Sequence, residues 1–121
     1  MALILTQQIP PPGIPGIFLR DILFTAGSLA QIVDGIDTIG FHSVKWIVTV
    51  NCFDLDLVRM FEVSALHRGG VNPIHTVFGD IGDRIRVGVD VTIQSGKLSL
   101  QLINNSGEDI TINVVRIQVV S

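Results

Sequence analysis

The sequence has little of what marks a disulfide-stabilised or sugar-binding protein. Its 121 residues include one cysteine, one tryptophan and no tyrosine. The single cysteine, Cys52, excludes an internal disulfide, in agreement with synthesis in a reducing compartment. With one tryptophan and no tyrosine, the chain offers few aromatic rings on which sugars could stack. These absences exclude a disulfide scaffold and weigh against a carbohydrate-binding module.

Charged residues are also scarce, at 16% of the chain, and the formal net charge is −3. Basic residues are scattered singly, so the electrostatic footprint of a nucleic-acid-binding protein is missing. No basic amphipathic stretch indicates a membrane surface, and the longest apolar stretches are much shorter than a bilayer span. The first residues lack the charged and hydrophobic regions of a signal peptide, so we expect no secretion. Neither a nucleic-acid nor a membrane partner is expected.

Hydrophobic residues, in contrast, make up 47% of the chain, which is high for a small solitary monomer. A chain of this length is expected to form one domain with a sizeable core. Its outer surface must also remain hydrated, and few charged side chains are available for this. We therefore expect another chain to cover part of the apolar surface, as in a homo-oligomer.

The main feature of the chain is a series of strand patterns between Val44 and Val120. Apolar residues occupy every second position in successive segments, so that one face of each strand is apolar and the other is wet. The predicted strands are 43–51, 57–67, 72–79, 84–94, 97–104 and 108–120. Short polar turns such as Ser95-Gly96 connect them and predict antiparallel pairing. The predicted fold is an all-β, jelly-roll-like antiparallel sandwich, with a three-stranded meander over 84–120.

Two shorter apolar segments precede this series. Residues 17–24 predict a buried strand, a turn follows at 25–28, and 29–33 predict a second short strand. Asp34-Gly35 is then expected to form another turn. A helix over 17–33 stays open as the alternative, because short apolar runs do not distinguish a helix from a strand.

Residues 1–16 are predicted to form a proline-rich extended arm, and residues 17–121 are predicted to form the sandwich domain. The arm holds four of the five prolines, which exclude an interior helix or central strand and favour an extended chain. Such an arm can reach roughly 50 Å, at about 3.1 Å per residue. Its apolar side chains predict that it lies along a partner surface, and a disordered terminus is the alternative. The expected interaction residues are Leu3, Leu5, Ile9 and Ile14.

Three histidines, His42, His67 and His75, are the first candidates for a metal site. His67 and His75 flank one turn and could approach each other across a hairpin. No HxH, HExxH or Cys/His spacing accompanies them, so the ligand pattern of a zinc site is missing. We expect instead that His67 ends a strand, with a ring nitrogen bonded to a turn carbonyl. No metal or other cofactor is predicted.

Acidic and nucleophilic residues form no recognisable catalytic pattern either. The acidic turns lack the ligand series of an EF-hand loop, so solvated turns are favoured over an exposed calcium site. Their carboxylates belong to Asp54, Asp56, Asp80 and Asp83. Ser64 and Ser99 belong to no recognisable triad, and Gly79-Asp80-Ile81-Gly82 lacks the ending of a phosphate loop. We expect no enzymatic activity and predict no catalytic residue.

Trp46 is the residue predicted to anchor the core. It shares one face of its strand with Val44, Val48 and Val50, which are all apolar. A sugar-stacking tryptophan would sit more naturally on a loop or on a polar face. We therefore expect the Trp46 side chain to be buried.

Residues 43–120 also carry short motifs in a characteristic order. In chain order they are Lys45-Trp46-Ile47-Val48-Thr49-Val50, Arg59, Phe61-Glu62-Val63, Ala65-Leu66-His67, Thr76-Val77-Phe78-Gly79, Val89-Asp90-Val91 and Gly96-Lys97-Leu98-Ser99-Leu100. This order resembles a β-sandwich module of virion structural proteins of tailed bacteriophages, particularly phages of cyanobacteria and marine bacteria. In that module a K-W/Y-x-V-x-V strand, an x-E-V-x-x-x-H-x-G hairpin and a [YF]-G step recur.

The resemblance implies a non-enzymatic structural protein of the virion, assembled in the host cytoplasm. Modules of this kind occur in head decoration proteins and in tail, baseplate and fibre proteins. We favour a capsid decoration (cement) protein, because a short chain with a reaching apolar arm suits a subunit that joins neighbours on a lattice. The expected partners are further copies of the chain, with a trimer favoured, and the major capsid protein or other virion proteins. A tail, baseplate or fibre component is the alternative, and a host-glycan-binding module is less favoured.

Overall fold

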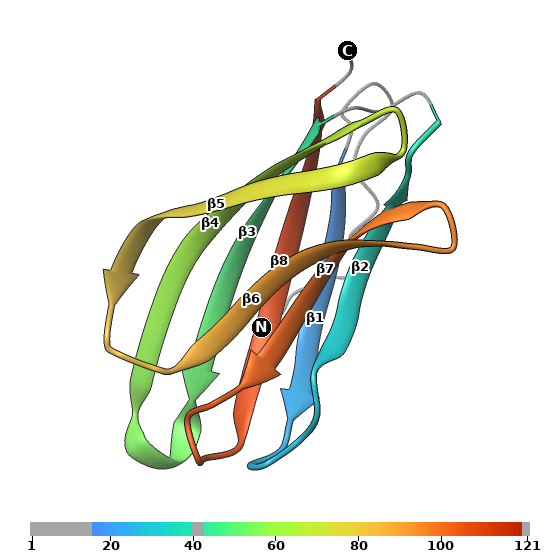
Figure 1. The fold of residues 1–121 in the computed structure, drawn as a ribbon. Helices are drawn as coiled ribbons and strands as arrows, with labels where there is room; N and C mark the ends of the chain where they lie inside the picture. The colour runs from blue at the N-terminus through green and yellow to red at the C-terminus, as the bar shows by residue number, and fades with distance from the viewer. Residues whose placement is uncertain (1–15, 40–42, 120–121) are drawn as a thin grey trace.

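In the computed structural model, which describes residues 16–39 and 43–119, the chain forms a sandwich of two antiparallel sheets (Figure 1). The strands are β1 (Gly16–Phe24), β2 (Gln31–Asp37), β3 (Ser43–Cys52), β4 (Leu57–Arg68), β5 (Val71–Gly82), β6 (Val87–Gln94), β7 (Lys97–Asn104) and β8 (Ile110–Val119). Among the described residues only the single turn η1 (Phe53–Leu55) is helical, and no helix there is long and apolar enough to cross a membrane. The predicted all-β antiparallel sandwich is confirmed.

The larger, five-stranded sheet has the order β1-β8-β3-β4-β5, and the smaller sheet has the order β2-β7-β6. Two successive hairpins join β3, β4 and β5, so these strands form a meander. The chain crosses from one sheet to the other between β1 and β2, β2 and β3, β5 and β6, and β7 and β8. Ser95 and Gly96 join β6 to β7, both at positive φ, as a two-residue hairpin turn of the primed type requires.

The core lies between the two sheets and follows the period of two. In β3 every second residue is buried, so the strand turns one complete face inward. The fully or nearly fully buried apolar residues are Phe24, Ile36, Val44, Trp46, Val48, Val50, Cys52, Phe61, Val63, Ala65, Ile85, Val91, Leu98, Leu100, Leu102, Ile110, Ile112 and Val114. Both sheets contribute to this set, so the core joins them into one unit.

The expected three-stranded meander over 84–120 is wrong. β7 lies between β6 and β2 in the smaller sheet, whereas β8 crosses over and pairs with β1 and β3 in the larger one. Consecutive strands that each have one apolar face can either pair edge to edge or pack face to face across a core. The alternating pattern does not distinguish these two arrangements. At the connection from β7 to β8, the two strands lie in different sheets, on opposite sides of the core.

The expected turn at Asp34-Gly35 is also wrong, because both residues lie inside β2. The register of β2 against β7 shifts between Ile32 and Asp34, which indicates a bulge rather than a chain reversal. At Gly35 the chain passes close to β7, and a Cβ there would lie 3.1 Å from the Oγ atom of Ser99. Glycine, which has no Cβ, therefore allows β2 and β7 to approach each other closely at this position.

The rest of the N-terminal region agrees only in part with expectation. The strand predicted at 17–24 is confirmed by β1, but the second strand begins at Gln31 rather than at residue 29. A helix over 17–33 is wrong, since strands occupy most of this segment. Apart from Gly16, the predicted arm over 1–16 lies outside the described residues, and so do its apolar residues Leu3, Leu5, Ile9 and Ile14.

Candidate functional site

Of the three candidate histidines, the structure describes His67 and His75, which are not direct partners across the β4–β5 hairpin. His67 is buried at the end of β4, where its Nδ1 atom accepts a hydrogen bond of 2.8 Å from the Gly70 N–H. This hydrogen bond joins the His67 ring to the turn that follows β4. His75 lies opposite Ala65 on β4, not opposite His67, and His42 lies outside the described residues. Within 16–39 and 43–119, no group of three His, Cys, Asp or Glu residues is placed to hold a metal ion.

The carboxylates that were considered for calcium serve separate local roles. Asp54 lies in η1, and Asp56 follows it with a left-handed backbone. The Asp83 carboxylate accepts a hydrogen bond of 2.9 Å from the Val58 N–H, and the Asp83 N–H donates to the Val58 carbonyl at 2.7 Å. Asp83 thus fastens the end of β5 to the start of β4, and Asp80 is bound by Arg59.

Arg59 organises the polar end of β4 and β5. Its guanidinium donates two hydrogen bonds to Asp80, of 2.8 and 3.0 Å, and a third of 2.9 Å to the Ile85 carbonyl. It also lies 4.6 Å from the ring centroid of Phe61. The hydrogen bond from Arg59 holds the pKa of the Asp80 carboxyl below its ordinary value of 3.8; burial opposes this effect, and the positive charge of Arg59 adds to it. Because the Asp80 side chain is 54% exposed, this pair contributes little to stability.

Asp80→Asn should lower the free energy of unfolding by no more than about 1 kcal/mol near neutral pH. Since folding lowers the pKa of Asp80, its charge stabilises the fold above the ordinary pKa of the residue. This contribution is lost as the pH falls through the lower pKa of the folded state. Urea unfolding of both proteins at neutral and at strongly acidic pH would measure the difference. A gap that stays the same at every pH would contradict this origin.

The remaining candidate nucleophiles lie in different parts of the sandwich. Ser64 lies on the outer side of β4, whereas Ser99 is buried in β7 and donates to the Lys97 carbonyl at 3.1 Å. Cys52 is buried at the end of β3 and forms no disulfide. The structure therefore does not place any two of these three side chains next to each other.

Asn104 has a structural role that its predicted place in a turn does not reveal. It ends β7 and is buried, and its side-chain amide donates to the carbonyls of Phe24, Thr25 and Glu108 at 3.1, 3.1 and 2.6 Å. Its Oδ1 atom accepts a hydrogen bond of 3.0 Å from the Ser106 N–H. One side chain thus satisfies the backbone where the chain crosses from β7 to β8 beside the end of β1.

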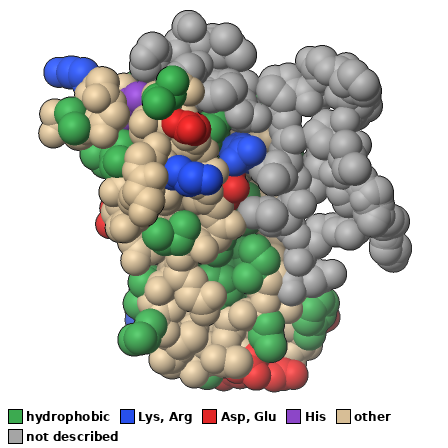
Figure 2. Space-filling view, turned by 90° about the vertical axis from the view of Figure 1, so that its right-hand side faces the viewer, with side chains coloured by type: hydrophobic (Ala, Val, Ile, Leu, Met, Phe, Trp, Pro, Cys, Tyr) green, Lys and Arg blue, Asp and Glu red, His purple; other side chains and the backbone are tan. Residues whose placement is uncertain are grey.

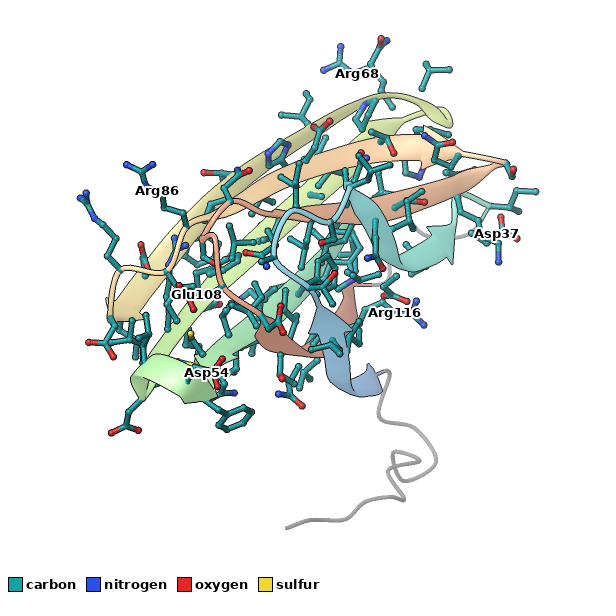
Figure 3. The ribbon with its side chains drawn as sticks, turned by 90° about the horizontal axis from the view of Figure 1, so that it is seen from below. Asp37, Asp54, Arg68, Arg86, Glu108 and Arg116 are labelled. Carbon is teal, nitrogen blue, oxygen red and sulfur yellow. The ribbon has the colours of Figure 1, made fainter. Side chains whose placement is uncertain are left out.

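A buried polar cluster of Asp34, Trp46 and Arg116 links the two sheets. Trp46 is fully buried, and its Nε1–H donates a hydrogen bond of 2.8 Å to the Asp34 carboxylate. Arg116, which comes from β8 and is labelled in Figure 3, donates to both Asp34 oxygens at 3.1 Å and to the Gly35 carbonyl at 3.1 Å. Only 7% of the Asp34 side chain and 14% of the Arg116 side chain are exposed.

The Asp34–Trp46–Arg116 cluster is not visible in the sequence. An Asp-Gly pair favours a turn, and nothing in the spacing of the three residues places an aspartate from β2 beside two side chains of the larger sheet. The only signal is that the sole tryptophan, in an apolar stripe, has an indole N–H that needs an acceptor when buried. The cluster holds the sheets together and leaves no open site.

The most extensive exposed feature is the outer side of the larger sheet, here called the outer face. Its residues alternate with the core residues along each strand, so they point away from the smaller sheet. Exposed large apolar side chains on the outer face are Leu23, Val58, Leu66, Val71, Ile74, Phe78, Ile81 and Ile117. Half-buried Ile47, Met60 and Val115 lie among them. Neither sheet of this chain covers these side chains.

The outer face carries little charge. Lys45 and Glu62 form an ion pair of 3.1 Å at its centre, and the Lys45 ammonium lies 5.6 Å from the ring centroid of Phe78. Along the described parts of β3, β4, β5 and β8, the other outward-facing positions are neutral except for Arg68 at the end of β4. In the side view of Figure 2, the charged side chains gather in the upper half and at the lower end of the described part, with hydrophobic ones between them.

A shallow groove of about 290 Å³ indents the outer face between β3, β4 and β5. Its lining includes Ser43, Lys45, Ser64, Leu66 and Ile74, and most of the exposed lining surface is apolar. The groove can therefore receive an apolar group of a partner.

No protein-family model and no curated protein matches this chain. The described residues offer a broad apolar surface on the outer face, which is suited to contact with another macromolecule.

Proposed function

We propose that this chain is a non-enzymatic structural protein of a tailed-phage virion that acts as a capsid decoration (cement) protein. The apolar outer face, with its single central ion pair, carries the proposal. A solitary soluble protein rarely leaves so large an apolar patch uncovered, whereas a subunit of a shell has neighbours to cover it. The order of motifs over 43–120, which resembles phage virion modules, supports the placement in a virion.

In this role the sandwich supplies a rigid body and the arm supplies reach. β1 begins at Gly16 and is an edge strand of the larger sheet, so the arm is joined to the sandwich at that edge. Apolar residues along the arm would lie on an adjacent subunit or on the major capsid protein. Two weak contacts that act together give far stronger attachment than either alone, provided that both can be made at once. A homo-oligomer is the favoured assembly, because a head lattice brings many copies of a decoration protein together.

The copy number and location in purified particles test the proposal. Particles of the phage that encodes the chain are separated into emptied heads and detached tails, and the chain is quantified in each by mass spectrometry. Hundreds of copies on heads are expected for a decoration protein. A few dozen copies on tails would replace this placement with a tail, baseplate or fibre component, and absence from particles would overturn the proposal.

Deleting residues 1–15 should abolish attachment to heads and leave the sandwich folded. The deletion ends before β1, so it removes no residue of either sheet. Unchanged far-UV circular dichroism and an unchanged melting temperature would verify the fold. Cosedimentation with heads that lack the protein would measure attachment of the truncated and full-length chains. Equal attachment of the two would contradict the role of the arm.

A further inference from the structure

We infer that the outer face is the surface through which copies of this chain contact one another. This inference deepens the proposed function and rests on it for the expectation that many copies work together. Contact through the same face of both copies pairs them about a twofold axis, so it favours a dimer over a trimer. A face of this kind could be covered by any apolar partner. The charge, size and relief of the outer face favour a second copy.

The charge of the outer face is compatible with an identical partner. Two copies that meet through the same surface bring like charges together, which costs energy wherever a charge is unpaired. Among the outward-facing side chains that the structure describes, the only central charges belong to Lys45 and Glu62, which already neutralise each other at 3.1 Å. Arg68 lies at the end of β4, at the margin, and projects from the body in Figure 3. Self-contact therefore leaves no central charge uncompensated.

The size of the outer face fits a specific contact. Its five strands lie about 4.8 Å apart, and strands of about ten residues rise about 3.3 Å per residue. These dimensions outline a surface of about 800 Å², close to the area that each partner contributes to a standard protein–protein interface. The face is therefore large enough for a stable contact without help from the smaller sheet.

The relief of the outer face offers both a hollow and protruding side chains. The groove beside Leu66 and Ile74 can receive an apolar group, and Phe78 and Ile81 stand exposed on the same face. A surface that carries both a hollow and projecting apolar groups can be complementary to a copy of itself. Burial of such groups supplies the main favourable free energy of association.

The free edge of β5 is a poorer place for a second copy than the face. Its register against β4 shifts twice, between Met60 and Glu62 and between Leu66 and Arg68. Pro73 lacks the N–H that a new strand would need, and irregular edges of this kind are how sheets resist edge-to-edge pairing. The contact between copies is therefore assigned to side chains of the face.

Ile74→Glu in the full-length chain tests the inference. A glutamate at this position places an unpaired charge beside the groove, so self-association should weaken by roughly 100-fold in Kd. The matched control is Ile32→Glu on β2 of the smaller sheet, since Ile32 is 48% exposed and Ile74 is 53% exposed. Sedimentation equilibrium over a range of concentrations gives the mass of each protein. The melting temperature establishes that each variant is folded.

The expected result is a wild-type oligomer that Ile74→Glu dissociates and Ile32→Glu does not. A wild-type protein with the mass of one chain at every concentration would overturn the inference. So would an oligomer that survives Ile74→Glu, or one that Ile32→Glu dissociates equally. If an oligomer dissociated by Ile74→Glu is absent from virions, only the proposed function fails. If a solitary chain decorates heads, only the inference fails.

Discussion

Replacement of Asp34 by alanine is expected to lower the free energy of unfolding by about 3–5 kcal/mol. The Asp34 carboxylate accepts hydrogen bonds from the Trp46 indole N–H and from the Arg116 guanidinium, and only 7% of its side chain is exposed. Alanine would leave both donors without this acceptor. The cost is large because the guanidinium of Arg116 would remain charged in a site that is mostly closed to water.

A set of variants separates the charge from the hydrogen bonds. Asp34→Asn keeps an acceptor for Trp46 but loses the charge, so it should cost less than Asp34→Ala. Arg116→Met in the Asp34→Ala background removes the stranded charge and should recover part of the lost stability. Urea unfolding followed by far-UV circular dichroism gives each free energy. A cost below about 1 kcal/mol for Asp34→Ala would show that water or a relaxed side chain replaces the carboxylate.

The sequence predicts the strands well because successive side chains of a pleated strand face opposite sides. Burial of one side therefore repeats at every second residue. Val44, Trp46, Val48 and Val50 alternate in the sequence and are all buried in β3. What this period cannot specify is which strands become neighbours. β8 repeats the pattern of β7 yet lies in the opposite sheet, because an apolar stripe is satisfied equally by an adjacent strand or by a strand across the core.

Residues of the candidate surface could be predicted only in part. The scarcity of charge and the high apolar content predict an uncovered surface, but not its position. That position depends on the sheets having five and three strands, since the broader sheet then turns a large second face toward solvent. Leu66 and Ile74 come from opposite sides of a hairpin and become neighbours only through the β4–β5 register. Contacts that depend on strand pairing and on bulges cannot be predicted from the local sequence.

Trp46→Ala is expected to lower the free energy of unfolding by about 3–5 kcal/mol. Trp46 is fully buried at the centre of the core, so alanine would leave a cavity lined by neighbours from both sheets. It would also leave the Asp34 carboxylate with Arg116 as its remaining partner in the cluster. Trp46→Phe fills most of the space but lacks the N–H donor, so it should cost about 1–2 kcal/mol.

Phe53→Ala is the matched control for Trp46→Ala, because Phe53 lies in η1 and is 73% exposed. Removing this aromatic side chain should change stability by no more than about 0.5 kcal/mol. Because Trp46 is the only tryptophan, unfolding of the variants is followed by far-UV circular dichroism, and wild-type fluorescence reports on position 46 alone. Acrylamide should quench this fluorescence poorly in the folded protein and readily in urea. Equal quenching in both states, or equal losses of stability at Trp46 and Phe53, would contradict the role of the indole in joining the two sheets.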